Sequence, residues 1–142
     1  MSLMSKNISK LRDIAEGLLP PLVDIRQVVL VIDDEFRNLR AFKADFRKPF
    51  KVFTALNLDE ALFFLRTEKI DIIFCDYKLP KMNGAEILGI ISKEYPNIKR
   101  VALTGFNTEK TRKEFRDKSN TTEIISKPYA RSEVFNSIYS IA

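Results

Sequence analysis

The sequence predicts a single doubly wound α/β domain in which five parallel strands alternate with five helices. Its 142 residues, 45% of them hydrophobic, suffice for one core and are too few for two. Beyond residue 27, short apolar segments alternate with longer amphipathic ones, and the connections are short. The first apolar segment, Val28–Ile32, is continuous and rich in β-branched residues, which is typical of a strand buried on both faces of a parallel sheet.

The remaining predicted helices and strands follow from the spacing of apolar residues and from residues that end or cap helices. Apolar positions at helical intervals predict a first helix over Phe36–Phe46, with Phe36 on its buried face, and Pro49 ends this helix. Asn57 or Asp59 can cap the second helix. The other predicted strands are Phe50–Thr54, Ile70–Cys75, Arg100–Leu103 and Thr122–Ser126. The other predicted helices are Gly84–Tyr95, the polar segment Asn107–Lys118, whose only large apolar residue is Phe115, and Ser132–Ile141.

Residues 1–26 lie outside this pattern and are expected to form an N-terminal extension to a domain spanning residues 27–142. Met1–Leu3, ahead of a second start-like Met4, resembles an expression scar. Pro20 and Pro21 would end a short helix with one apolar face, formed by Leu11, Ile14, Ala15, Leu18 and Leu19. Such a segment could be a helix packed on the domain, a dimer contact or the end of a linker.

The composition excludes several classes of function. With no histidine and one cysteine, Cys75, the chain has neither a Ser-His nor a Cys-His catalytic pair, no multi-cysteine zinc site and no internal disulfide. The single cysteine fits a reducing cytoplasm. No apolar run approaches the roughly 20 residues of a membrane span. The net charge of +5 comes from basic residues interleaved with acidic ones, so direct nucleic-acid binding is not expected.

The residues that carry chemistry follow the predicted strands. Asp33 and Asp34 follow the first strand, Asp76 the third, Thr104 the fourth and Lys127 the fifth. In an open parallel sheet, ligands bind beyond the carboxyl ends of the strands, so these side chains are expected to meet at one edge.

This set of side chains suits phosphoryl transfer. Three aspartates at one edge repel one another unless a cation lies among them, and oxygen-only ligands suit Mg²⁺. An aspartate carboxylate can attack a phosphoryl group, while a hydroxyl and an ammonium stabilise the charge on the phosphoryl oxygens. We therefore expect Mg²⁺-dependent transfer of a phosphoryl group onto Asp76, with Thr104 and Lys127 beside it.

Four motifs resemble those of the receiver domain of two-component response regulators (CheY-like). They are Val31–Glu35, Cys75–Gly84, Ala102–Gly105 and Ser126–Pro128, in family order and spacing. The resemblance spans about residues 27–142. It implies a flavodoxin-like (βα)5 fold with strand order 2-1-3-4-5, and a signalling module that is not an enzyme beyond its own phosphorylation and dephosphorylation.

The same resemblance implies a role for each matching residue. Asp76 is similar to the phosphoacceptor, Asp34 to the direct metal ligand and Asp33 to a ligand acting through water, while the backbone carbonyl of Lys78 would complete the Mg²⁺ site. Thr104 is similar to the hydroxyl that follows the phosphoryl group, and Lys127 to the lysine that pairs with a phosphoryl oxygen. The bond before Pro128 is often cis in the family, and Lys78 and Phe106 occupy positions that tune phosphoryl lifetime.

One residue departs from the family pattern. Ile124, three residues before Lys127, stands where most receivers carry Tyr or Phe, so the inward rotation of an aromatic ring is not available here. The phosphoryl donor would be a phosphohistidine on a sensor histidine kinase or a histidine phosphotransfer protein, and the sequence does not name the downstream target or output domain.

Two alternatives stay open at this point. The first is a pseudo-receiver, a phosphorylation-independent protein-binding module, for which Ile124 leaves room. The second is a Mg²⁺-dependent phosphohydrolase, but such an enzyme usually has a second Asp two residues after the nucleophile, where this chain has Lys78.

Overall fold

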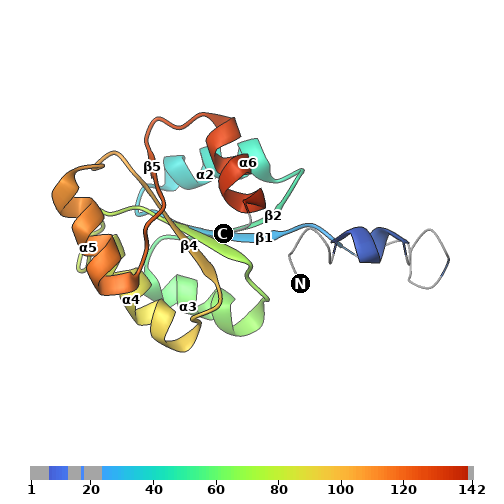
Figure 1. The fold of residues 1–142 in the computed structure, drawn as a ribbon, viewed down its shortest axis with the longest axis horizontal. Coiled ribbons are helices and arrows are strands. Elements are labelled where there is room, and N and C mark those ends of the chain that lie inside the picture. Colours follow the sequence, from blue (N-terminus) through green and yellow to red (C-terminus); the bar gives the residue numbers. More distant parts are fainter. Residues whose placement is uncertain (1–6, 13–16, 18–23, 141–142) are drawn as a thin grey trace.

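The computed structural model describes residues 7–12, 17 and 24–140. Five parallel strands form one sheet in the order β2-β1-β3-β4-β5 (Figure 1), which confirms the predicted fold class and strand order. The strands are β1 (Val28–Ile32), β2 (Lys51–Ala55), β3 (Ile72–Cys75), β4 (Lys99–Thr104) and β5 (Ile124–Ser126).

The helices cover both faces of this sheet. Helices α2 and α6 lie on one face and α3, α4 and α5 on the other (Figure 1). Asn57 caps α3, because its side chain accepts a hydrogen bond from the Glu60 amide at 2.9 Å. The helices are α2 (Phe36–Phe46), α3 (Leu58–Thr67), α4 (Gly84–Glu94), α5 (Glu109–Ser119) and α6 (Arg131–Tyr139).

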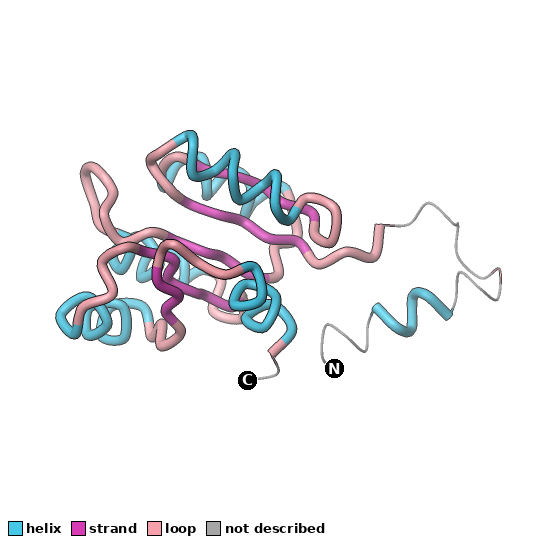
Figure 2. Tube along the Cα trace, turned by 90° about the horizontal axis from the view of Figure 1, so that it is seen from above, coloured by secondary structure: helices cyan, strands magenta, loops and turns pink. Residues whose placement is uncertain are grey.

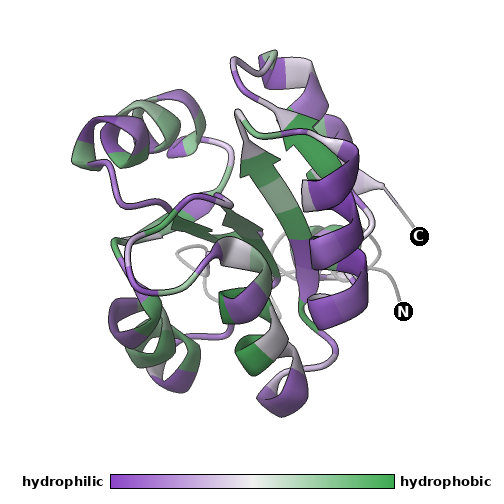
Figure 3. Ribbon diagram, turned by 90° about the vertical axis from the view of Figure 1, so that its left-hand side faces the viewer, coloured by the Kyte–Doolittle hydropathy of each residue, from purple (hydrophilic) through white to green (hydrophobic). Residues whose placement is uncertain are grey.

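Alternation along the central strand β1 divides the core into two clusters. Val29 and Val31 pack with apolar residues of α2 and α6, whereas Leu30 and Ile32 pack with those of α3, α4 and α5. Figure 3 shows hydrophobic residues gathered in the strands and hydrophilic ones on the outer sides of the helices. Two apolar layers therefore pack against opposite faces of the sheet. They fix the positions of the carboxyl ends of its strands.

Helix α5, the predicted polar helix, is held by a narrow buried stripe. Phe115 is fully buried, with Thr111 and Ser119 one turn to either side of it. Gly89 of α4 allows α5 to approach closely, since a Cβ at this position would lie 2.7 Å from the Lys118 carbonyl oxygen. Most of the remaining surface of α5 faces solvent and is charged.

The structure corrects one predicted core residue. Phe36 is 61% exposed, whereas Leu39, Phe42 and Phe46 of the same helix are buried. Phe36 is the first residue of α2 and lies at the carboxyl edge of the sheet, so it does not reach the core. Its ring instead lies 5.8 Å from the guanidinium of Arg40.

Residues 7–12 form a helical segment ahead of the domain (Figure 2). Ile8 and Leu11 are 56% and 53% exposed, so these two side chains are not buried against the described part of the domain. The other residues of the predicted apolar face, Ile14, Ala15, Leu18 and Leu19, fall outside the described residues, as do Met1–Leu3 and Ile141. Within the described residues, no helix is long and apolar enough to cross a membrane.

Candidate functional site

The ammonium of Lys127 joins two carboxylates at the carboxyl edge of the sheet. Its Nζ lies 2.5 Å from Asp33 Oδ2 and 3.0 Å from Asp76 Oδ2. The strand register brings these residues together, because Ile32 pairs with Cys75 and the Asp76 amide donates to the Ile32 carbonyl at 3.0 Å. Three of the side chains predicted to meet therefore do meet, from three different strand ends.

Asp33 is fixed by several donors besides Lys127. It is 3% exposed, and its Oδ1 accepts a hydrogen bond from the Glu35 amide at 2.9 Å. The Asn38 side chain donates to its Oδ2 at 3.1 Å. These donors fix the orientation of the Asp33 carboxylate at the edge of the sheet.

The charge of Lys127 is maintained by the two carboxylates. Burial alone would lower the pKa of Lys127, but its hydrogen bond to Asp33 and the charge of Asp76 outweigh burial and raise the pKa. The side chain is only 21% exposed, so solvent screens these interactions weakly. Lys127 is thus a permanent cation between two acids.

Asp76 lies in a loop whose backbone is packed unusually tightly. Its Oδ1 accepts a hydrogen bond from the Tyr77 amide at 2.7 Å, and its side chain is 13% exposed. The Gly84 amide closes the loop by donating to the Tyr77 carbonyl at 2.8 Å. A Cβ at Gly84 would lie 1.8 Å from the Asp76 carbonyl oxygen, so only glycine fits at this position.

Thr104 ends β4 beside this loop. Cys75 pairs with Ala102, so Asp76 and Thr104 leave neighbouring strands at the same edge. The buried Thr104 hydroxyl accepts a hydrogen bond from the Phe106 amide at 3.1 Å, and the Thr104 carbonyl accepts one from the Lys127 amide at 3.0 Å. The bond between Lys127 and Pro128 is cis.

A cavity of about 500 Å³ lies beside α2, and its lining includes Asp33 and Lys127 but not Asp76. Asp45 and Arg131 also line it, together with several apolar residues. The cavity therefore reaches the Asp33–Lys127 pair from the side of α2.

Comparison with known proteins shows the family of this chain. The family model of the response regulator receiver domain matches residues 29–139. The chain belongs to the response regulator receiver domain family. Receiver domains are signalling modules, and the resemblance read from the four motifs is confirmed at the level of the family.

Two curated proteins contain similar receiver segments. The hydrogenase transcriptional regulatory protein HoxA of Cupriavidus necator is 32% identical over 83 residues, which cover 58% of this chain and 17% of HoxA. The CAI-1 autoinducer sensor kinase/phosphatase CqsS of Vibrio cholerae is 29% identical over 115 residues, 78% of this chain and 16% of CqsS. The chain thus spans about a sixth of the length of these relatives.

Solved receiver domains share the fold. A receiver domain from Clostridium thermocellum is 29% identical and has a TM-score of 0.71, covering 79% of this chain and 90% of that one. The signal receiver domain of an HD domain-containing protein from Pseudomonas fluorescens has a TM-score of 0.75 at 24% identity, covering 80% of this chain and 91% of that one.

The other two predicted ligands of this receiver lie at its surface. Asp34 and Lys78 are both exposed, and the Lys78 ammonium lies 5.2 Å from the centre of the Phe106 ring. Within the described residues, no group of three or more His, Cys, Asp or Glu side chains is arranged to hold a metal. The oxygen donors nevertheless fit Mg²⁺, which needs only one or two carboxylates and retains several waters.

Sequence reasoning missed the side chains that link this site to its surroundings. Asn38 donates to Asp33 from five residues further along the chain, in the first turn of α2, an interval that no helical spacing indicates. Tyr77 donates to Glu114 Oε1 at 3.0 Å, and Asn83 donates to Glu114 Oε2 at 3.1 Å. No sequence signal joins Glu114 to residues more than 30 positions away.

Proposed function

We propose that this receiver domain is a phosphorylation switch in which Asp76 accepts a phosphoryl group from a partner's phosphohistidine. The observation that carries the proposal is the Lys127 ammonium held between Asp33 and Asp76 at the carboxyl edge of the sheet. A partly buried cation beside a carboxylate is suited to meet an incoming phosphoryl oxygen. The receiver domain proper would comprise residues 27–142, with residues 1–26 as an extension.

Each residue has a defined part in the proposed transfer. A carboxylate oxygen of Asp76 attacks phosphorus, an O–P bond forms as the P–N bond of phosphohistidine breaks, and the imidazole leaves with the electron pair. Lys127 then pairs with a phosphoryl oxygen. The hydroxyl of Thr104 exchanges the Phe106 amide for the phosphoryl group, which changes the loop after β4.

Mg²⁺ would neutralise charge on the phosphoryl oxygens when it is bound. Asp34 and Asp76 would hold it directly, Asp33 through water, and the Lys78 carbonyl would complete the protein ligands. The exposure of Asp34 supports this arrangement, because Asp34 can contact an ion that enters from solvent.

The partners follow from the donor chemistry. A chain without histidine needs a phosphohistidine on another protein, a sensor histidine kinase or a histidine phosphotransfer protein. The name of CqsS, a sensor kinase/phosphatase, supports this class of partner. We propose that the partner transfers the phosphoryl group in the cytoplasm. The single cysteine supports this location, because it fits a reducing compartment.

Intact-mass measurement after acid quenching tests the proposal. The full chain is incubated with Mg²⁺ and acetyl phosphate, beside Asp76→Asn as the matched variant. We expect one phosphoryl group on the wild type and none on Asp76→Asn. Equal labelling of both proteins would refute the assignment of Asp76.

A second candidate function is a phosphorylation-independent binding module. Two observations favour it: Ile124 replaces the usual aromatic residue, and the described acids are not gathered into a three-carboxylate group. Beryllofluoride, which mimics a phosphoryl group on a carboxylate, separates the candidates. Absence of both an acetyl phosphate adduct and beryllofluoride binding would favour the binding module.

A further inference from the structure

The cavity of about 500 Å³ beside α2 presents two charged side chains that the phosphoacceptor site does not use. They are Asp45 of α2 and Arg131, the first residue of α6. We propose that this cavity, named the α2 cavity, binds a free amino acid with an apolar side chain. The ammonium group of the ligand pairs with Asp45 and its carboxylate with Arg131. Such binding is independent of the proposed function, because Asp76 does not line the cavity.

One side of α2 forms a long wall of the α2 cavity. Asn38, Ala41 and Asp45 line it at intervals of three and four residues, so they share one side of the helix. Asn38 bonds to Asp33, whereas Asp45 lies two turns further along, at roughly 10 Å along the helix axis. The α2 cavity therefore extends well beyond the pair formed by Asp33 and Lys127.

The rest of the lining is mainly apolar. Val31 of β1 and Leu103 of β4 line the cavity from the sheet face that α2 and α6 cover. Tyr129, from the segment between β5 and α6, packs edge to face on Phe42, with ring centroids 6.1 Å apart. Small-molecule sites of roughly 300–1,000 Å³ combine apolar walls with a few polar groups, as this cavity does. The lining thus suits a compact ligand with an apolar body.

Asp45 selects a ligand with a positive charge. Its side chain is half-buried, and among the described residues its carboxylate accepts a hydrogen bond only from the Tyr129 hydroxyl. That bond is 3.5 Å long, which exceeds the usual length of an O–H···O bond. A carboxylate in these surroundings attracts an ammonium group and repels phosphates and other simple anions.

Arg131 provides the complementary charge. Its guanidinium donates to the Asp45 backbone carbonyl at 3.0 Å and lies 5.8 Å and 6.0 Å from the ring centres of Phe46 and Phe135. These contacts fix its position, and most of its five N–H donors remain for a ligand carboxylate.

The two charged side chains are neighbours that do not neutralise each other. The described side chains of Asp45 and Arg131 form no salt bridge with one another. The other two charged groups of the lining, Asp33 and Lys127, already pair at 2.5 Å. A zwitterion with an apolar side chain therefore matches both free charges and the apolar walls together.

Calorimetric titration of the full chain with L-phenylalanine tests the class of ligand. We expect saturable binding of one phenylalanine per chain. L-phenylalaninamide lacks the carboxylate and N-acetyl-L-phenylalanine lacks the ammonium group, so each should bind at least about tenfold more weakly. Equal affinity for the amide would indicate a peptide N-terminus or a simple amine and would overturn the proposal. Absence of binding of both phenylalanine and leucine at millimolar concentration would also overturn it.

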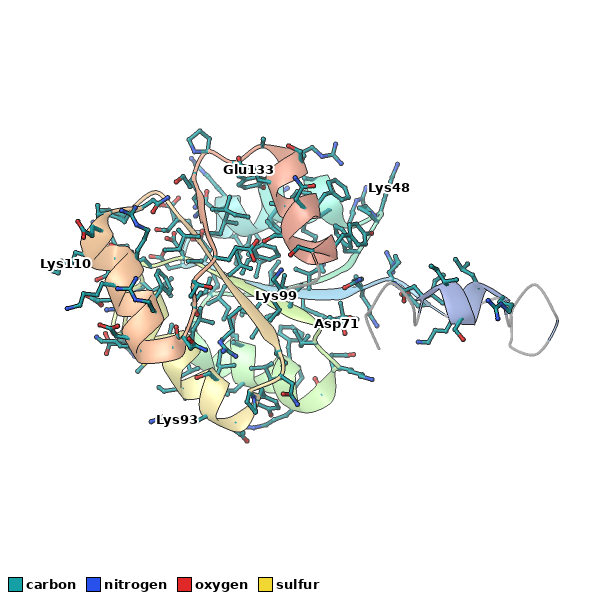
Figure 4. All side chains as sticks on the ribbon, viewed as in Figure 1. Lys48, Asp71, Lys93, Lys99, Lys110 and Glu133 are labelled. Carbon is teal, nitrogen blue, oxygen red and sulfur yellow. The ribbon has the colours of Figure 1, made fainter. Side chains whose placement is uncertain are left out.

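Substitution of Asp45 tests where the ammonium group binds. We expect Asp45→Asn to weaken phenylalanine binding about tenfold and to leave the affinity for N-acetyl-L-phenylalanine within about twofold. Asp117→Asn is the matched control, since Asp117 is an exposed residue of α5, on the other face of the sheet. Figure 4 shows Lys110 of α5 away from Glu133 of α6. Equal losses in the two variants would contradict the role of Asp45.

A pair of alanine substitutions tests the cavity itself. Ala41 and Ala44 are both exposed residues of α2, but only Ala41 lines the cavity. We expect Ala41→Leu, which fills the cavity, to abolish phenylalanine binding, and Ala44→Leu to keep the affinity within about twofold. Urea denaturation checks that both variants are folded. Equal phenylalanine binding by the two folded variants would overturn the proposal.

Discussion

The hydroxyl of Tyr77 donates a hydrogen bond to Glu114 Oε1 at 3.0 Å, which joins the loop after Asp76 to the middle of α5. Asn83, from the far end of the same loop, donates to the other oxygen of Glu114 at 3.1 Å. Burial and the bond to Glu114 together raise the pKa of Tyr77, so the phenol stays protonated and donates. A single carboxylate thus holds both ends of the phosphoacceptor loop against α5.

Removing the Tyr77 hydroxyl should weaken this connection. We expect Tyr77→Phe to lower the free energy of unfolding by about 1 kcal/mol, because a hydrogen bond to a charged group is lost. Urea denaturation measures the change. Tyr139→Phe is the control, since the Tyr139 hydroxyl makes no hydrogen bond with the described residues and should shift stability by less than about 0.5 kcal/mol. Equal effects of the two substitutions would contradict the assigned bond.

Gly84 should tolerate no side chain. A Cβ there would overlap the Asp76 carbonyl oxygen at 1.8 Å, so Gly84→Ala must displace the phosphoacceptor loop. We expect a loss of about 3 kcal/mol in the free energy of unfolding, measured by urea denaturation. Gly105→Ala is a matched control at the same sheet edge, because no atom lies within 4 Å of its added Cβ. Similar stability of the two variants would show that the loop is not packed as described.

Tyr129 should make stability depend on alkaline pH. Burial, followed by the nearby charge of Asp45, raises the pKa of Tyr129 from 10.0 to about 12. The folded state therefore favours the protonated phenol, and this contribution is complete below about pH 10 and is lost as the pH rises through about 12. We expect Tyr129→Phe to remove about 2 kcal/mol of this pH dependence.

Urea titrations of wild type and Tyr129→Phe at about pH 9 and about pH 12 measure that difference. The buried Cys75 thiol, whose pKa burial raises well above its ordinary value, contributes an alkaline loss of its own that is common to both proteins. The difference between the two proteins isolates Tyr129. An equal change in the free energy of unfolding of both proteins between the two pH values would refute the titration of Tyr129 in this range.

Asp34 should be needed for Mg²⁺ binding. We expect Asp34→Asn to weaken Mg²⁺ binding at least about tenfold, because a charged ligand is removed. Tyr77, next to Asp76, gives a fluorescence signal free of tryptophan, which the chain lacks. The adjacent acid provides the control, as Glu35→Gln should leave the affinity within about twofold. A larger loss of Mg²⁺ affinity in Glu35→Gln than in Asp34→Asn would contradict the assignment of Asp34 as the metal ligand.

The main features of the fold and the site were predictable because they depend on local patterns. The apolar runs located the strands, and the residues after them, Asp33, Asp76 and Lys127, meet because carboxyl ends of parallel strands share one edge. The exposure of Phe36 was not predictable, because helical periodicity does not say where a helix extends past the sheet.

Side-chain contacts that depend on how helices and loops pack also could not be predicted from the sequence. The bonds of Glu114 to Tyr77 and of Asn107 to Arg112 depend on how α5 lies against two loops, which the close approach at Gly89 and the burial of Phe115 determine. These distances emerge only from packing.

Borohydride trapping of the acyl phosphate tests the central claim most directly. The full chain is treated with acetyl phosphate and Mg²⁺ and then with sodium borohydride, which reduces an aspartyl phosphate to homoserine, and the peptides are sequenced by mass spectrometry. The account predicts homoserine at position 76 and at no other aspartate. Homoserine at position 33 or 34, or none in a sample whose intact mass shows the phosphoryl adduct, would contradict it.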